Sequence, residues 1–336
     1  MKNYLIKHKV LVAVMSITVV CLLLLWNLLI VQRRQGINLD NGIDSVSFSS
    51  NDRYLAVASS HGVQVYDVAT EELYKTVMTF RGILNPIAST GAYYSNDGEQ
   101  LVVLSPMDSG STTSRKVKLE EEFPVFDSAS LKITNQKPKA YISTERANWG
   151  KGYWAELGIW TDIDDPEWDA THPQYEADTI VVQMGGSPFV IKVPDDPSEF
   201  AINTFNSKLA IASNIGDVYI FDLQKRKITS SFSCELQKSD GGGSCTSLIW
   251  FPKQHLIWAS NVEGRSVFWD SLHHKVKADI QIPLVITCAA INHAGDSIAF
   301  GTMDGQVHII QTKQLLKAIN NGSIVHFFLT VSESAH

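Results

Sequence analysis

The amino-acid sequence predicts an all-β fold built from one repeated hairpin. The repeat is clearest at 209–222, LAIASNIGDVYIFD, where two alternating strands flank the turn Gly216-Asp217. Period-two alternation around a Gly-containing turn is typical of a β-hairpin. The pattern recurs at 55–67, 256–270 and 298–310, with a looser copy at 101–127. A hairpin that recurs at this interval predicts a β-propeller, because a closed ring buries the faces that a single blade leaves exposed.

We expect six four-stranded blades, with seven as the alternative. The first blade has strands at 44–49, 54–58, 63–68 and 73–80, and the second begins near residue 88. In the third blade we place strands at 140–144, 154–161, 179–184 and 189–193. Blades four, five and six cover 200–232, 246–280 and 286–319, where 314–319 is either a strand or a short helix. An apolar run at 324–331, IVHFFLTV, is interpreted as a last strand that closes the ring.

The repeats resemble those of WD-repeat β-propellers over roughly residues 42–320. The resemblance is carried by the ends of the third strands, Tyr66-Asp67, Phe126-Asp127, Phe221-Asp222 and Trp269-Asp270, and by the turns at 96–98 and 304–305. Only one of these strands ends in a literal Trp-Asp, no repeat opens with Gly-His, and the sixth ends in Ile310-Gln311. The resemblance implies a rigid platform for protein partners, usually without catalysis.

An apolar segment precedes the repeats. Residues 10–32, VLVAVMSITVVCLLLLWNLLIVQ, contain no charged side chain. As a helix this segment would span roughly 34 Å, enough for a bilayer core of about 30 Å. A cleaved signal peptide is the alternative, but its apolar core would be shorter, about 7–15 residues, and small residues would mark a cleavage site. We therefore expect an uncleaved single-span transmembrane helix.

Basic residues flank this segment on both sides. Lys7 and Lys9, with Lys2, lie before it, and Arg33 and Arg34 follow it. The positive-inside rule then favours a cytoplasmic N-terminus, with the propeller on the opposite, periplasmic, extracellular or lumenal side. The expected organisation is a basic segment at 1–9, the anchor at 10–32, a linker at 33–42, the propeller at 43–331 and a tail at 332–336.

Two polar insertions are candidate contact loops. One covers 107–122, and the other, DIDDPEWDATHPQYEAD, covers 162–178 in the third blade. The second loop contains carboxylates, but Pro166 and Glu167 break the spacing of a calcium-binding EF-hand loop. Trp and Tyr are enriched in interface anchors, so we interpret this loop as a protein contact. The candidate contact residues are Trp149, Asp162, Asp164, Asp165, Glu167, Trp168 and Tyr175.

Four cysteines are too few for a disulfide scaffold. Cys234 and Cys245 flank the loop ELQKSDGGGS and are a candidate disulfide pair if the domain faces an oxidising compartment. Cys288, within an expected inner strand, is interpreted as a buried small hydrophobic residue. No nucleophile elbow, phosphate-binding Gly loop or metalloprotease helix occurs, so we expect no catalytic residue, no metal and no cofactor.

A net charge of −7 provides no basic footprint, which argues against nucleic acid as the main partner. We therefore expect a non-catalytic protein-interaction scaffold, or an accessory subunit of a membrane-associated complex, with other proteins as partners. The alternative is a propeller enzyme or ligand sensor that uses the central channel. Such a site needs converging polar groups, whereas the expected inner strands offer mainly small or hydroxyl residues, Ser45, Ser47, Thr204, Ser247 and Ala289.

Overall fold

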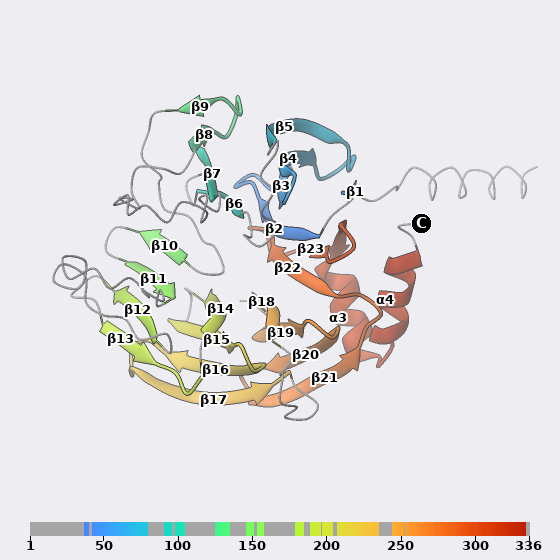
Figure 1. Ribbon diagram of the computed structural model, residues 1–336. Helices are drawn as coiled ribbons and strands as arrows, with labels where there is room; N and C mark the ends of the chain where they lie inside the picture. The colour runs from blue at the N-terminus through green and yellow to red at the C-terminus, as the bar shows by residue number, and fades with distance from the viewer. Residues whose placement is uncertain are drawn as a thin grey trace, which may run out of the picture.

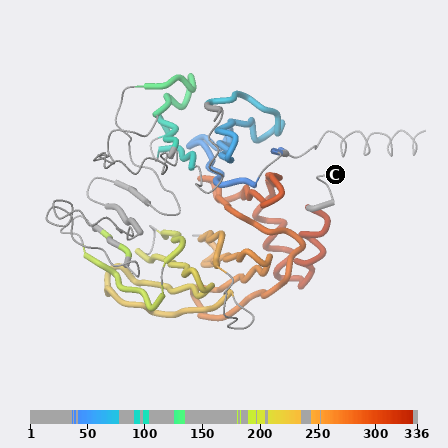
Figure 2. The backbone as a smooth tube through the Cα atoms, in the orientation of Figure 1, coloured from blue at the N-terminus to red at the C-terminus, as the bar shows by residue number. Residues whose placement is uncertain are grey.

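The chain forms antiparallel sheets arranged around a common centre in the computed structural model (Figures 1 and 2). It describes residues 37–39, 42–79, 91–95, 98–104, 125–134, 146–150, 153–157, 179–184, 189–195, 197–203, 207–234, 244–251 and 253–333. Within these ranges lie six sheets of four strands each, in which neighbouring strands are antiparallel. The predicted all-β class is confirmed.

Each sheet runs from an inner strand to an outer one. The first contains β2 (Ile43–Phe48), β3 (Tyr54–Ser59), β4 (Gly62–Asp67) and β5 (Leu73–Thr79). The second contains β6 (Gly91–Tyr94), β7 (Gln100–Leu104), β8 (Val125–Asp127) and β9 (Ile133–Thr134). The third contains β10 (Arg146–Gly150), β11 (Tyr153–Leu157), β12 (Thr179–Met184) and β13 (Phe189–Lys192).

The remaining sheets follow the same order. The fourth contains β14 (Pro197–Asn203), β15 (Lys208–Ser213), β16 (Asp217–Asp222) and β17 (Lys227–Ser233). The fifth contains β18 (Cys245–Phe251), β19 (Leu256–Asn261), β20 (Arg265–Asp270) and β21 (Lys275–Gln281). The sixth contains β22 (Ile286–Ile291), β23 (Ser297–Thr302) and β24 (Gln306–Gln311), and its fourth strand is β1 (Ile37–Asn38).

The first strand of the third sheet was placed incorrectly. We expected it at 140–144, but the strand that pairs with β11 is β10, Arg146–Gly150. Gly150 is the register partner of Tyr153, so only two residues separate these two strands in the sequence. The sequence where the two strands meet, Gly-Lys-Gly at 150–152, is a turn signal that was not used in the prediction.

The ring is not closed by residues 324–331. This apolar run forms helix α4 (Ile324–Glu333), which follows helix α3 (Thr312–Asn320). Ile324 and Phe328, four residues apart, are buried, while Val325 and Leu329 are exposed. One buried side chain per helical turn is the pattern of an amphipathic helix, and a short apolar run does not by itself distinguish a helix from a strand.

The closing strand comes from the expected linker instead. In β1, Ile37 is the register partner of Val307 and Asn38 that of Gln306, both in β24. The N–H of Leu39 continues this pairing by donating to the carbonyl of Gly305 at 2.7 Å. Ile37 is buried in an apolar cluster with Ile43 and Val307. The linker assignment of 33–42 is therefore wrong for these two residues.

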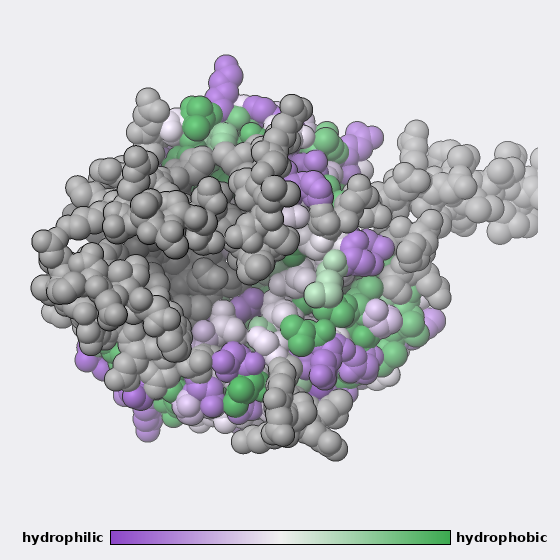
Figure 3. Space-filling model, viewed as in Figure 1, coloured by the Kyte–Doolittle hydropathy of each residue, from purple (hydrophilic) through white to green (hydrophobic). Residues whose placement is uncertain are grey.

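Apolar cores lie between successive sheets and beneath the helices. The largest includes Trp258 and Phe268 of the fifth sheet and Phe300 of the sixth. Phe328 of α4 lies 5.7 Å from Trp258 between ring centroids, so α4 covers this core. Hydrophobic atoms remain visible near the α3–α4 corner of the ring (Figure 3).

The aspartates at the ends of the third strands hold the turns that follow. The carboxylate of Asp222 accepts the N–H groups of Gln224 and Lys225, and Asp270 accepts those of Leu272 and His273. Asp67 and Asp127 accept equivalent bonds in their turns. Each turn ends on a residue with a left-handed φ of 50–58°: Glu71, Leu131, Arg226 and His274. These repeated aspartates are therefore turn caps.

The sixth sheet departs from this pattern. Gln311 occupies the place of the capping aspartate, and the chain continues directly into α3 at Thr312. After β24 the described residues form α3 and α4, and no outer strand follows among them. The vacant outer position is filled by β1 from the other end of the described chain.

The charge of Asp270 stabilises the fold. Burial acts to raise its pKa, but the backbone N–H and side chain of His273 and the N–H of Leu272 outweigh burial, so the pKa is lowered. A carboxylate whose pKa is lowered on folding stabilises the protein above its unfolded pKa, about 4, and that contribution is lost as the pH falls through the folded pKa.

We predict that Asp270→Ala lowers the free energy of unfolding at pH 7 by about 2 kcal/mol, because two backbone donors lose a charged acceptor. The difference from wild type should shrink as the pH falls below about 4, because the carboxyl is then protonated in the unfolded state while it is still ionised in the folded state. Urea unfolding at pH 7 and at a pH below about 4 measures the difference in the free energy of unfolding between the variant and wild type. The exposed Glu263→Ala is the control, and an equal loss in both variants would contradict the capping role.

Candidate functional site

The predicted contact loop lies mostly outside the described residues. Trp149 belongs to β10, so its backbone is in the first strand of the third sheet. Asp162, Asp164, Asp165, Glu167, Trp168 and Tyr175 fall in 158–178, which the structure does not describe, as do the flanks Lys7, Lys9, Arg33 and Arg34. The insertion at 107–122 is also outside the described ranges. These assignments stay predictions.

Cys234 and Cys245 are both buried and both free thiols. A hydrogen bond between the Cys245 thiol and the Cys234 side chain, followed by burial, raises the pKa of Cys245 well above its ordinary value. The two thiols are therefore neighbours although they belong to consecutive sheets, and the disulfide stays a prediction. Burial likewise raises the pKa of Cys288 to about 12. Such thiols are unreactive, because the thiolate is the reactive form.

The inner strands carry hydrogen bonds between neighbouring sheets that were not predicted from the sequence. In β14, β18 and β22 the register shifts at the second residue, which is a β-bulge. The bulged residue is Ser198, Thr246 or Thr287, and its hydroxyl donates to the first residue of the next sheet's inner strand. The acceptors are the carbonyls of Cys245, Ile286 and Ile43.

Other hydroxyls near the centre are also engaged between sheets. Ser45 Oγ accepts the N–H of Ala92 at 2.9 Å, and Ser47 Oγ accepts that of Tyr94 at 3.1 Å. These inner-strand hydroxyls thus join neighbouring blades. The sequence feature that could have predicted these bonds is a Ser or Thr at the second position of β14, β18 and β22.

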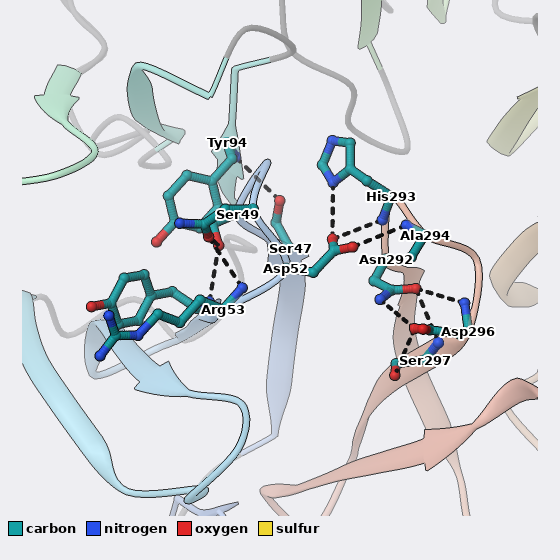
Figure 4. A network of polar contacts seen from close by, with 12 residues as sticks. Ser47, Ser49, Asp52, Arg53, Tyr94, Asn292, His293, Ala294, Asp296 and Ser297 are labelled. Atoms are coloured by element: carbon teal, nitrogen blue, oxygen red, sulfur yellow. Dashed lines mark hydrogen bonds and ion pairs between the residues drawn. The ribbon is translucent and has the colours of Figure 1, made fainter.

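A polar network joins the first and sixth sheets (Figure 4). Asp52, in the turn between β2 and β3, accepts the N–H groups of His293 at 2.8 Å and Ala294 at 2.9 Å. Asn292 shapes the opposite turn, because its side-chain oxygen accepts the N–H groups of Asp296 and Ser297. This network, the β1–β24 pairing and the Thr287–Ile43 bond are three separate ties across the seam.

Besides a groove of about 540 Å³ next to α3, two grooves between blades are prominent on the described surface. One, of about 480 Å³, lies at the seam between the turns of the first sheet, the strand β24 and the helix α4. Its lining includes Arg53, Glu71 and Phe327. The other, of about 360 Å³, lies between the third and fourth sheets. Among the described residues there is no group of three or more His, Cys, Asp or Glu side chains that could hold a metal ion.

Comparisons with known proteins place the fold. No family model and no curated protein matches the sequence. Among solved structures, "Structure of U3-55K" matches with a TM-score of 0.54 and 12% identity, over 81% of this chain and 96% of that one. A chain of "Crystal Structure of Mitotic Checkpoint Complex" matches with a TM-score of 0.55 and 14% identity, over 83% and 92%. Both are WD40 β-propellers. The fold is a β-propeller. At these identities the likeness shows the propeller fold alone.

A substitution at a β-bulge tests how much the hydroxyl bonds between blades stabilise the ring. We predict that Thr246→Val lowers the free energy of unfolding by about 1–2 kcal/mol, because the Ile286 carbonyl, 2.6 Å from Thr246 Oγ1, loses its inter-blade donor. Chemical denaturation measures the change. Thr76→Val, at an exposed position of β5, is the matched control and should be nearly neutral. Equal stability of Thr246→Val and wild type would show that the bond contributes nothing.

Proposed function

We propose that this protein is a membrane-anchored, six-bladed β-propeller that acts as a non-catalytic scaffold or accessory subunit for other proteins. The observation that supports the proposal is that inner-strand hydroxyls form hydrogen bonds between blades. The hydroxyls of Ser198, Thr246 and Thr287 each donate to a carbonyl of the next sheet. A ring held in this way presents rigid loops and grooves to partners. WD40 neighbours support a protein-interaction role.

The alternative, an enzyme or ligand sensor that works through the channel, finds less support. Such a site needs side chains that are free to meet a ligand at the centre. The described inner-strand hydroxyls of Ser45, Ser47 and Thr246 are instead hydrogen-bonded to adjacent sheets. The grooves between the outer strands are therefore the better candidate contact surfaces.

Membrane attachment is proposed from the sequence. Residues 10–32 contain no charge and are long enough to cross a bilayer core. They lie outside the described residues, and within the described ranges no helix is long and apolar enough to span a membrane. Residues 33–36 alone separate the segment from β1, so the anchor would join the ring at its seam.

Four extended residues cover at most about 14 Å, so this seam would lie close to the bilayer. We also propose that the propeller is on the non-cytoplasmic side, because more basic residues precede the segment than follow it. Protease digestion of sealed vesicles tests this orientation: a cytoplasmic-side protease that removes the propeller would contradict it.

The central experiment is purification of the full-length chain from membranes in a mild detergent, followed by identification of the proteins recovered with it. We expect a reproducible set at constant stoichiometry, whereas recovery of the chain alone with a bound small molecule would favour the sensor. Leu23→Lys/Leu24→Lys should abolish membrane association, because charge at the centre of a span is costly. Leu23→Ala/Leu24→Ala is the matched control and should remain in the membrane fraction.

A further inference from the structure

The groove between the third and fourth sheets combines cationic and apolar side chains. It lies between the outer strand β13 and the region where β16 turns into β17 (Figure 1). The side chains that define its chemistry are Phe189, Val190, Lys192, Arg226, Lys227 and Ile228. Three of these six are basic and none is acidic, in a chain whose net charge is −7. The groove is therefore a local exception to the charge of the protein.

The geometry of the groove is set by the repeated turn. Arg226 is the last residue of the turn that Asp222 caps, and its left-handed φ of 51° is shared by the equivalent residues of other blades. Its guanidinium lies over the ring of Phe189 in the neighbouring sheet, 4.4 Å from the ring centroid. This cation–π contact joins the two walls of the groove and positions a positive charge at the junction.

Carboxylates on the adjoining elements are already engaged. Asp222 accepts the N–H groups of Gln224 and Lys225, and its second oxygen lies 3.3 Å from the Lys225 ammonium. Asp195 accepts the hydroxyl of Tyr219 at 2.6 Å. Neither carboxylate is among the groove-lining residues. Within the described part of the chain, neither Arg226 nor Lys227 is paired with a carboxylate, so these two charges can meet an anionic partner.

Apolar side chains lie among these charges. Val190 is 52% exposed and Ile228 is 37% exposed. β13 is the last strand of its sheet and pairs only with β12 among the described strands, so one backbone edge has no strand partner there. An exposed strand edge can accept an extended peptide by backbone hydrogen bonding, while alternate side chains enter neighbouring pockets. Apolar groups on the peptide would cover Val190 and Ile228.

The dimensions and charge favour a peptide over nucleic acid. A groove of about 360 Å³ accommodates a few side chains, and three cations are a small footprint for a phosphate backbone. Carboxylates that alternate with apolar side chains would meet both kinds of group in the groove. We propose that this groove binds an extended acidic segment of a partner protein, in which apolar side chains lie between the carboxylates. This inference rests on the proposed scaffold function and names the chemistry of its partner.

The blade next in sequence provides a matched control. Lys227 is the register partner of Asp222, and Lys275 is the register partner of Asp270 in the fifth sheet. Arg226 and His274, with φ of 51° and 52°, occupy the same position in the two turns. A charge reversal at 274 and 275 therefore repeats the change at 226 and 227 in the same local backbone, away from the groove.

The test uses the full-length chain in detergent and a fluorescein-labelled peptide, EVEFEVE, with KVKFKVK as the peptide control. Fluorescence anisotropy should show binding of the acidic peptide only, and the affinity should fall as salt is added because exposed charges are screened. Arg226→Glu/Lys227→Glu should weaken binding at least about tenfold. His274→Glu/Lys275→Glu should bind like wild type, and thermal midpoints should confirm that both variants are folded.

Absence of binding by wild type, equal binding of both peptides, or equal loss in both double variants would overturn the inference. So would binding that occurs only when the acidic residues of 162–178 are replaced by Asn and Gln, since the groove would then be covered by the chain itself. Arg226→Gln/Lys227→Gln is a milder second variant if the charge reversal does not fold. Purification distinguishes the two proposals: recovery of no protein set from wild type contradicts the scaffold, whereas an unchanged set with the double variant contradicts only the groove.

Discussion

Closure of the ring is the constraint on which the rest of the structure depends. Each sheet buries its faces mainly against the neighbouring sheets, so the first and sixth sheets must also meet. Two residues of β1, Ile37 and Asn38, complete the sixth sheet from the opposite end of the described chain. The carboxylate of Asp52 and the hydroxyl of Thr287 add polar bonds across the same seam. A chain closed in this way gains stability from contacts between segments more than two hundred residues apart.

The same closure has a consequence for function. Four residues, 33–36, separate the segment proposed to cross the membrane from β1, so the proposed attachment point is the seam itself. Helix α4 packs over the adjoining core and leaves Val325 and Leu329 exposed at this corner. The third and fourth sheets, which flank the cationic groove, lie on a different part of the ring from α4 (Figure 1). Attachment and partner binding would therefore use separate surfaces.

Local pattern predicted most of the blades, whereas long-range contacts could not be predicted. The hairpin at 208–222 depends on local features of the sequence. These are the alternation of side chains along its strands and the turn at Gly216, and both are visible in the sequence. β1 is two residues long, and only Val307 and Gln306 opposite it make it a strand. The apolar run at 324–331 is compatible with a strand or a helix, and the burial of Ile324 and Phe328 against the core favours the helix. The Arg226–Phe189 contact likewise depends on the packing of two sheets.

Hydrogen exchange of the full-length chain tests ring closure most directly. If β1 is an integral strand, the amides of β1 and β24 should exchange with the same free energy of opening as those of the buried strand β19, because the seam opens only when the ring unfolds. Exchange of the β1 and β24 amides at the rate of an exposed turn, with β19 still protected, would contradict the account. The ring would then be stable without its closing strand.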